Sequence, residues 1–186
     1  MLCASFSAAL LALALCGGAF AAPLGATQDA FLDDLEKRAF TYFLEQTDPY
    51  TGLVRDRAGA DGARKPAHAD ACNMAAGGVG LSALCVGAER GWLSRDEARR
   101  RAVTALEFAV EKSTQVHGWL YHFVSPADGS RMWDSEVSSI DTGFLLAGAL
   151  TVKGCFPEDK KIASLSDALY KRLDFKWMLN GGKLLS

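Results

Sequence analysis

Hydrophobic and polar residues alternate with helical spacing over residues 29–46. Apolar side chains recur every four residues, at Phe31, Leu35, Ala39 and Phe43. Charged side chains fill the intervening positions, so the pattern predicts an amphipathic helix at the surface. Residues 48–52 combine Asp, Pro, Tyr, Thr and Gly, a composition typical of a turn that ends the helix.

Two later segments, residues 73–90 and 138–155, have a different pattern. Neither residues 74–88 nor residues 142–152 carry a charge, and glycine and alanine are frequent in both. Because a helix that is apolar on every side is buried, both segments are predicted to be inner helices. Glycine weakens a helix, but it also lets another backbone or a ligand approach closely.

Two further segments return to the amphipathic pattern. Ser94, with Glu97 three residues later, forms a capping box that predicts the start of a third helix. Residues 160–173 form the last of the five predicted helices, again with one apolar stripe. Between the third and fourth helices, the aromatic segment 119–123 predicts an irregular β-hairpin that ends near Trp133.

The predicted helices therefore alternate in character along the chain. Amphipathic helices start near Asp29, Arg95 and Lys160, at a spacing of roughly 65 residues, and an apolar helix lies in each interval. This alternation is typical of helical hairpins stacked around an axis, whereas a simple bundle would give every helix a polar face. The predicted fold class is all-α, with about five helices and a small β-hairpin insertion.

Length and composition fit a single domain. The 186 residues are 49% hydrophobic, which is enough for a substantial core. The formal net charge of −2 lacks the basic bias of nucleic-acid-binding proteins, so no nucleic-acid partner is expected. The oligomeric state is left open by the sequence.

The N-terminal segment resembles an export signal. An apolar run begins near Leu2, ends near Phe20 and is followed by small residues of the kind that signal peptidase recognises. Residues 1–21 are predicted to be a signal peptide and residues 22–186 the mature domain, in the periplasm or secreted. Two alternatives stay open: an uncleaved membrane anchor, or a lipoprotein anchored through Cys16. No stable membrane insertion is expected after cleavage.

Three cysteines follow the predicted signal peptide, at Cys72, Cys85 and Cys155. An odd number argues against a complete disulfide framework, and all three have apolar sequence neighbours. Buried free thiols are therefore expected, with a disulfide as the alternative.

Several segments of the chain resemble the bacterial glucoamylase-like family of glycoside hydrolases, which includes endo-β-1,2-glucanases. They occur in the family's order and cover essentially the whole predicted mature chain: residues 40–43, 48–57, 80–92, 117–123, 133–142 and 176–182. Among them, residues 133–142 form a fairly specific motif.

The resemblance implies a barrel of six helical hairpins, an (α/α) barrel, with a sugar-binding cleft at one end. It also implies hydrolysis of β-linked glucans without a cofactor, with β-1,2-glucan among the candidate substrates. Family members are much longer than this chain. Residues 22–186 are therefore expected to form an incomplete barrel, truncated at the C-terminus, with part of the catalytic machinery outside the chain.

Glycoside hydrolysis usually needs two carboxyl groups, one to protonate the leaving oxygen and one to activate water or attack the sugar. Glu136 and Asp141 are the catalytic candidates, because they lie in the specific motif at the predicted start of an inner helix. Glu136 is the first candidate for acid or base, and its alternative is a solvated or ion-paired glutamate. Asp141 has the alternative role of a capping partner for Ser138.

Other polar and aromatic residues are candidates for binding the sugar. They are Asp56, Arg57, Trp119, Tyr121, His122, Trp133 and Asp134. The alternatives are a surface ion pair between Asp56 and Arg57 and core packing of the aromatic rings. The three histidines, His68, His117 and His122, lack the spacing of a metal site, so no metal is expected.

Two functions remain open at this point. The first is hydrolysis of a β-linked glucan by paired carboxylates, with an oligo- or polysaccharide as partner and the chain as part of a longer enzyme. The second is a non-catalytic glycan-binding or scaffold protein that keeps the aromatic wall of the cleft without a complete acid pair. In either case a half barrel would expose its apolar inner helices, which predicts poor solubility or a partner chain.

Overall fold

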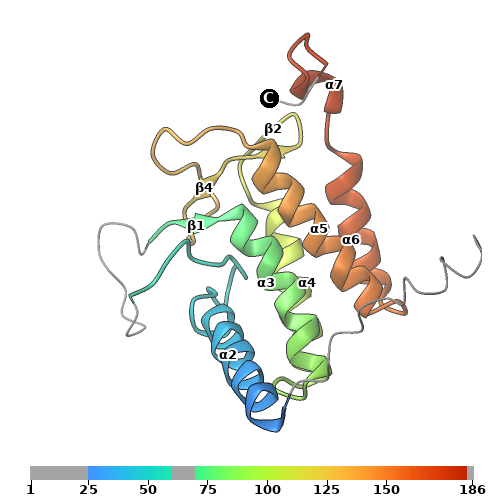
Figure 1. The fold of residues 1–186 in the computed structure, drawn as a ribbon. Coiled ribbons are helices and arrows are strands. Elements are labelled where there is room, and N and C mark those ends of the chain that lie inside the picture. Colours follow the sequence, from blue (N-terminus) through green and yellow to red (C-terminus); the bar gives the residue numbers. More distant parts are fainter. Residues whose placement is uncertain (1–24, 60–69, 184–186) are drawn as a thin grey trace, which may run out of the picture. The chain divides into compact units, whose positions relative to one another are not determined.

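The computed structural model describes residues 25–59 and 70–183, and helices dominate it (Figure 1). The helices are α2 (Ala26–Glu45), α3 (Met74–Glu89), α4 (Arg95–Glu111), α5 (Ser139–Cys155), α6 (Lys160–Lys171) and α7 (Phe175–Met178). The strands have two residues each: β1 (Cys72–Asn73), β2 (Gln115–Val116), β3 (Trp119–Leu120) and β4 (Phe123–Val124). The all-α prediction with a small β insertion is confirmed. The predicted signal peptide, Cys16 and His68 lie outside the described residues.

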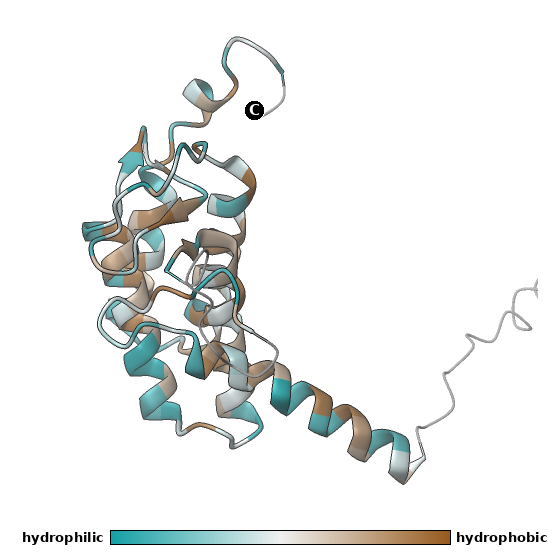
Figure 2. Cartoon of the chain, turned by 90° about the vertical axis from the view of Figure 1, so that its left-hand side faces the viewer, coloured by the Kyte–Doolittle hydropathy of each residue, from teal (hydrophilic) through white to brown (hydrophobic). Residues whose placement is uncertain are grey.

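The five predicted helices correspond to α2–α6, and α7 is an additional short turn of helix. Hydrophilic and hydrophobic residues alternate along α2, as its amphipathic pattern predicts (Figure 2). The chain divides after Leu35 into two compact units. Every feature discussed below belongs to the second unit, Glu36–Ser186. Among the described residues, none of the helices has the length and apolar character that a membrane crossing requires.

Four helices of the second unit pack together as two antiparallel hairpins, α3–α4 and α5–α6. Helix α3 contacts both α4 and α5, and α6 also contacts both of these helices. The apolar stripes of α4 and α6 face inward, with Ala98, Ala102, Leu106, Ile162 and Leu169 fully buried. The amphipathic pattern predicted for α4 and α6 is therefore confirmed: their apolar sides form part of the core.

Helices α3 and α5 approach each other so closely that their backbones touch. A Cβ atom added at Gly78 would overlap the carbonyl of Phe144, and one added at Gly148 would overlap the carbonyl of Gly78. Only glycine fits where two helix backbones are in direct contact. The glycines that weaken these helices are therefore needed for their packing.

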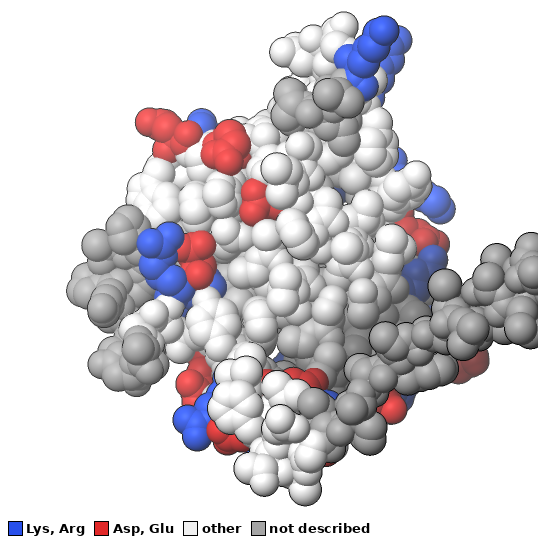
Figure 3. Space-filling model, in the orientation of Figure 1, with Lys and Arg blue, Asp and Glu red and all other residues white. Residues whose placement is uncertain are grey.

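The prediction that α3 and α5 are buried on every side is wrong for this chain. Val79 and Val86 on α3 are 44% and 39% exposed, and Phe144 and Leu150 on α5 are 51% and 52% exposed. Few charged side chains interrupt this face (Figure 3). The buried sides face α4, α6 and each other, whereas no described residue covers the remaining side. The half-barrel expectation of exposed inner helices is confirmed.

The β strands form two separate two-stranded sheets, whereas the sequence predicted one irregular hairpin. Strands β2 and β3 form a hairpin whose turn residues, His117 and Gly118, have φ angles of 50° and 87°. Strand β4 instead pairs antiparallel with β1, with Cys72 opposite Val124. This second pairing joins distant parts of the sequence, so local alternation of polar and apolar residues gave no sign of it.

The glycine contact yields a stability prediction. Gly78→Ala is expected to lower the free energy of unfolding by about 2–3 kcal/mol, because the added methyl forces the two backbones apart. Gly143→Ala is the matched control on α5, since a Cβ there meets nothing within 4 Å. That control is expected to be neutral or to stabilise by about 0.5–1 kcal/mol through better helix propensity. Equal effects of the two substitutions in chemical denaturation would refute the close contact.

Candidate active site

The N-terminal ends of α3 and α5 meet the same irregular segment. The backbone N–H of Met74, at the start of α3, donates to the carbonyl of His122 at 3.3 Å. The N–H of Ser138, just before α5, donates to the carbonyl of Leu120 at 2.9 Å. Segment 119–124 therefore lies across the first turns of both inner helices and carries side chains to that end of the helix pair.

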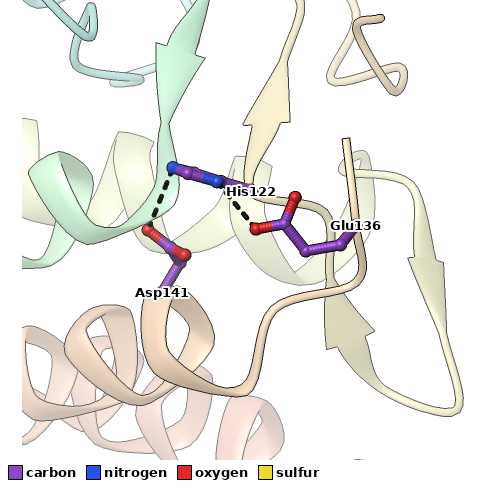
Figure 4. Close-up of side chains that lie close together, drawn as sticks. All are labelled: His122, Glu136 and Asp141. Carbon is purple, nitrogen blue, oxygen red and sulfur yellow. Dashed lines mark hydrogen bonds and ion pairs between the residues drawn. The ribbon is translucent and has the colours of Figure 1, made fainter. Parts of the chain in front are cut away.

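Three side chains form a bridged cluster there: His122, Glu136 and Asp141 (Figure 4). His122 Nδ1 lies 2.9 Å from Glu136 Oε1, and His122 Nε2 lies 3.7 Å from Asp141 Oδ1. The imidazole thus stands between two carboxylates, one on each ring nitrogen. The side chain of Glu136 is 65% exposed, that of His122 27% and that of Asp141 11%. The cluster therefore runs from a buried carboxylate to an exposed one.

Asp141 is fixed by the cap of α5. Ser138 is the N-cap residue: its Oγ accepts a hydrogen bond from the backbone N–H of Asp141 at 3.1 Å and donates to the Asp141 carboxylate. The capping role considered for Asp141 is therefore present: one carboxylate oxygen belongs to the cap, and the other faces His122.

The surroundings of Glu136 favour its ionised form. A hydrogen bond with its own backbone lowers the pKa of Glu136 below the ordinary 4.5, partial burial opposes this, and hydrogen bonding to His122 adds to the lowering. At neutral pH the ionised Glu136 accepts a hydrogen bond from the Nδ1–H of His122. In this state Glu136 can take up a proton or stabilise positive charge, but it has no proton to give.

An aromatic surface adjoins the cluster. Phe123 stacks on the ring of His122 with centroids 3.8 Å apart, and Trp133 packs edge-on against Phe123 at 5.1 Å. Trp133 is 50% exposed and has a φ of 52°, an uncommon backbone conformation for a bulky residue. Held in this way, the indole leaves half of its apolar surface available to a ligand.

Asp56 and Arg57 reach the start of α3. Asp56 Oδ1 accepts from the Nδ2 of Asn73, the N-cap of α3, at 3.3 Å. Its other oxygen pairs with Arg57 at 2.5 Å, so the ion pair considered as an alternative is present. Asp134 is exposed beside Trp133. These polar groups belong to the same two helix starts as the cluster.

Trp119 and Tyr121 lie elsewhere. Trp119 is 2% exposed, and its indole N–H donates to the carbonyl of Asp174 at 2.9 Å. Tyr121 packs against the core with the guanidinium of Arg131 4.9 Å from its ring centroid. The structure does not bring the Trp119 ring to the exposed aromatic surface, and its geometry matches the alternative of core packing.

Sequence spacing did not suggest that His122 bridges Glu136 and Asp141. One nitrogen of His122 and one oxygen from each carboxylate lie within 4.8 Å of one another, close enough in principle to hold a metal ion. However, the two carboxylates contact opposite nitrogens of the ring, so this arrangement serves hydrogen bonding rather than coordination of one ion. His117, the other described histidine, stacks on Trp177 instead.

A larger cavity lies away from this cluster. It measures about 600 Å³ and is lined by Arg95, Arg99 and residues 156–161, between the starts of α4 and α6. Of its two acidic residues, Glu158 and Asp159, Asp159 is occupied in capping α6 and in pairing with Arg99. The cluster around His122 is the better candidate for an active site, because it combines a carboxylate at low pKa, an imidazole and an exposed indole.

Three comparisons with known proteins show what this chain is similar to. No family model matches the chain. Over 160 residues it is 28% identical to the exo-β-1,2-glucooligosaccharide sophorohydrolase (non-reducing end) of Parabacteroides distasonis, covering 81% of this chain and 21% of that protein. An endo-β-1,2-glucanase from Chitinophaga pinensis, solved with sophorotriose and glucose, matches with a TM-score of 0.76 and 26% identity, covering 88% of this chain and 40% of that one. A presumed glucoamylase from Bacteroides fragilis matches with a TM-score of 0.72 and 27% identity, covering 87% and 41%.

The chain is therefore similar to β-1,2-glucan hydrolases and glucoamylase-like proteins over part of their length. It spans 21% of the length of the curated relative and 40% of the C. pinensis chain. The neighbours are α/α-barrel hydrolases, so the two hairpins described above are part of such a barrel.

The cap of α5 gives a prediction for the candidate site. Ser138→Ala is expected to lower the free energy of unfolding by about 1–2 kcal/mol, because it removes the N-cap acceptor and a partner of Asp141. Ser139→Ala, one position later in the same turn, is the matched control and is expected to change stability by less than about 0.5 kcal/mol. If thermal unfolding gave the two variants the same stability, Ser138 would not be the residue that fixes Asp141.

Proposed function

We propose that this chain contributes the Glu136 side of an active site that hydrolyses a β-linked glucan, with β-1,2-glucan as the favoured substrate. The observation that carries the proposal is the bridged cluster Asp141–His122–Glu136 beside the half-exposed Trp133. The activities of the P. distasonis and C. pinensis enzymes, both on β-1,2-linked glucose chains, support the choice of substrate.

Glu136 is the member of the cluster that meets substrate in this proposal, because it is the exposed end. As an ionised carboxylate it would take a proton from the attacking water while the oxygen of that water bonds to the anomeric carbon. His122 would hold the Glu136 carboxylate in place through Nδ1. Asp141, buried and tied to Ser138, would orient the imidazole from its other nitrogen.

We propose that Glu136 and Asp141 are not themselves the opposed pair of carboxyl groups that a glycosidase uses. Their nearest oxygens lie within 4.8 Å of each other, with the imidazole between them. Retaining enzymes separate their carboxyl groups by about 5–5.5 Å and inverting enzymes by about 6.5–9.5 Å, and in both cases the sugar lies between the two groups. Here the ring of His122 occupies that place. We therefore propose that the acid that protonates the leaving oxygen faces Glu136 from outside this cluster, and that Asp141 acts on His122 rather than on the sugar.

The sugar would lie against Trp133. An indole that is half exposed offers a flat apolar face to a sugar ring, and the polar residues Asp134, Asp56 and Arg57 would hydrogen-bond its hydroxyl groups. The partner is accordingly an oligo- or polysaccharide. Export to the periplasm or outside the cell, with anchoring through Cys16 as the alternative, would bring the protein to such a substrate.

A second candidate is glycan binding without turnover. The open apolar face of α3 and α5 favours it, since a chain with these helices exposed has an incomplete wall around any sugar. In that case Trp133 and its polar neighbours would bind a glucan, and Glu136 would serve only as a hydrogen-bond acceptor.

The proposal predicts the result of Glu136→Gln. The variant would be tested in a chimera in which this chain replaces the matching part of the C. pinensis enzyme, assayed by release of reducing ends from β-1,2-glucan. Loss of the base is expected to lower turnover by at least about 100-fold with circular dichroism unchanged. Glu158→Gln, on an exposed position outside the cluster, is the matched control and is expected to retain full activity.

Two outcomes separate the candidates. Undiminished turnover in a folded Glu136→Gln chimera would remove Glu136 from the mechanism. If a folded chimera with Glu136 intact releases no reducing ends while the chain itself binds β-1,2-glucan in calorimetry, the binding function replaces the hydrolytic one.

A further inference from the structure

The ends of α3 and α5 remote from the cluster carry one cysteine each. Cys85 lies seven residues after Gly78, and Cys155 lies seven residues after Gly148. Seven residues are close to two turns of an α-helix, so each cysteine projects from the same side of its helix as the glycine before it. Because the glycines mark the contact line and the helices run in the same direction, both thiols face the neighbouring helix.

The two thiols do meet. The side chains of Cys85 and Cys155 line the same cavity at the edge of the core, close enough for Cys155 to raise the pKa of Cys85. All three described cysteines are free, but Cys72 is completely buried on β1, at the other end of the helix pair. Cys85 and Cys155 are therefore neighbouring thiols on two helices that are in direct backbone contact.

A small oxidant can reach this pair. Cys85 and Cys155 line a cavity of about 400 Å³ together with Val86, Glu36, Glu89 and Arg90. Both cysteines are only partly buried. Burial, together with the neighbouring Cys155 thiol, raises the pKa of Cys85 to about 12, so little Cys85 thiolate forms at neutral pH and oxidation is expected to be slow.

We propose that Cys85 and Cys155 are a disulfide-forming pair that locks the far end of the α3–α5 helix pair. In the presence of a small disulfide such as oxidised glutathione, the two thiols lose their protons and one Sγ–Sγ bond forms. The two electrons reduce the glutathione disulfide to two glutathione thiols, which take up the two protons. The bond closes a loop of 70 residues between the two helix ends, so it restricts the unfolded chain.

The link stabilises the helix pair without touching the cluster around His122. The cysteines lie at the C-terminal ends of α3 and α5, whereas Asn73 and Ser138 cap the opposite ends. The inference depends only on the packing of these helices and does not rest on the proposed hydrolytic function.

The test is oxidation of the full chain. The reduced protein is incubated with oxidised glutathione at about pH 8.5, where more thiolate forms, then alkylated and digested without reduction. Mass spectrometry is expected to find the peptides of Cys85 and Cys155 joined, with loss of two hydrogens. The melting temperature is expected to rise by about 5 °C or more and to return on reduction.

Three variants complete the experiment. Cys85→Ser and Cys155→Ser are each expected to abolish both the link and the thermal shift, while Cys72→Ser, the matched control, keeps both. Circular dichroism and the melting temperature of each reduced variant show that it is folded before oxidation. The proposal is overturned if Cys85 and Cys155 remain alkylatable after oxidation, carry only glutathione, or join to another cysteine.

Discussion

The direct backbone contact between α3 and α5 is the constraint on which the rest of the described structure depends. Gly78 and Gly148 let the two inner helices run side by side in the same direction. Their N-terminal ends consequently lie together, and the segment that carries His122 spans both of them. A side chain at either position would separate the helix starts, and with them the residues that we assign to the site.

This arrangement gives the two carboxylates different environments. Asp141 is tied to the N-cap of α5 and shielded, whereas Glu136 projects from the loop before the helix into solvent. His122 connects the buried Asp141 to the exposed Glu136, because one ring nitrogen faces each carboxylate. Orientation of this kind is what a general base requires, since a misplaced proton acceptor loses most of its effect. The stacked rings of His122 and Phe123, with Trp133 against them, extend this surface toward the proposed sugar site.

Local sequence pattern was sufficient for the helices and their starts. The charge-free stretches predicted α3 and α5, and Ser94 and Ser138 marked the N-caps that the structure contains. Glu136 and Asp141 could be proposed from their motif, but their connection through His122 could not, because it depends on how the chain folds back across both helix starts. The same holds for the β1–β4 pairing and for the burial of Trp119, whose partner Asp174 lies 55 residues away. The charge-free stretches also suggested burial on all sides, and this failed because a helix is buried only where other chain segments cover it.

The most direct measurement of the central claim is an NMR titration of the chain with sophorotriose. If the ends of α3 and α5 build the sugar site, the resonances of His122, Phe123, Trp133 and Glu136 will shift together with one affinity. If the shifts instead concentrate on Arg95, Arg99 and Phe156, around the larger cavity, or if sophorotriose causes none, the assignment of this cluster as the sugar site is wrong.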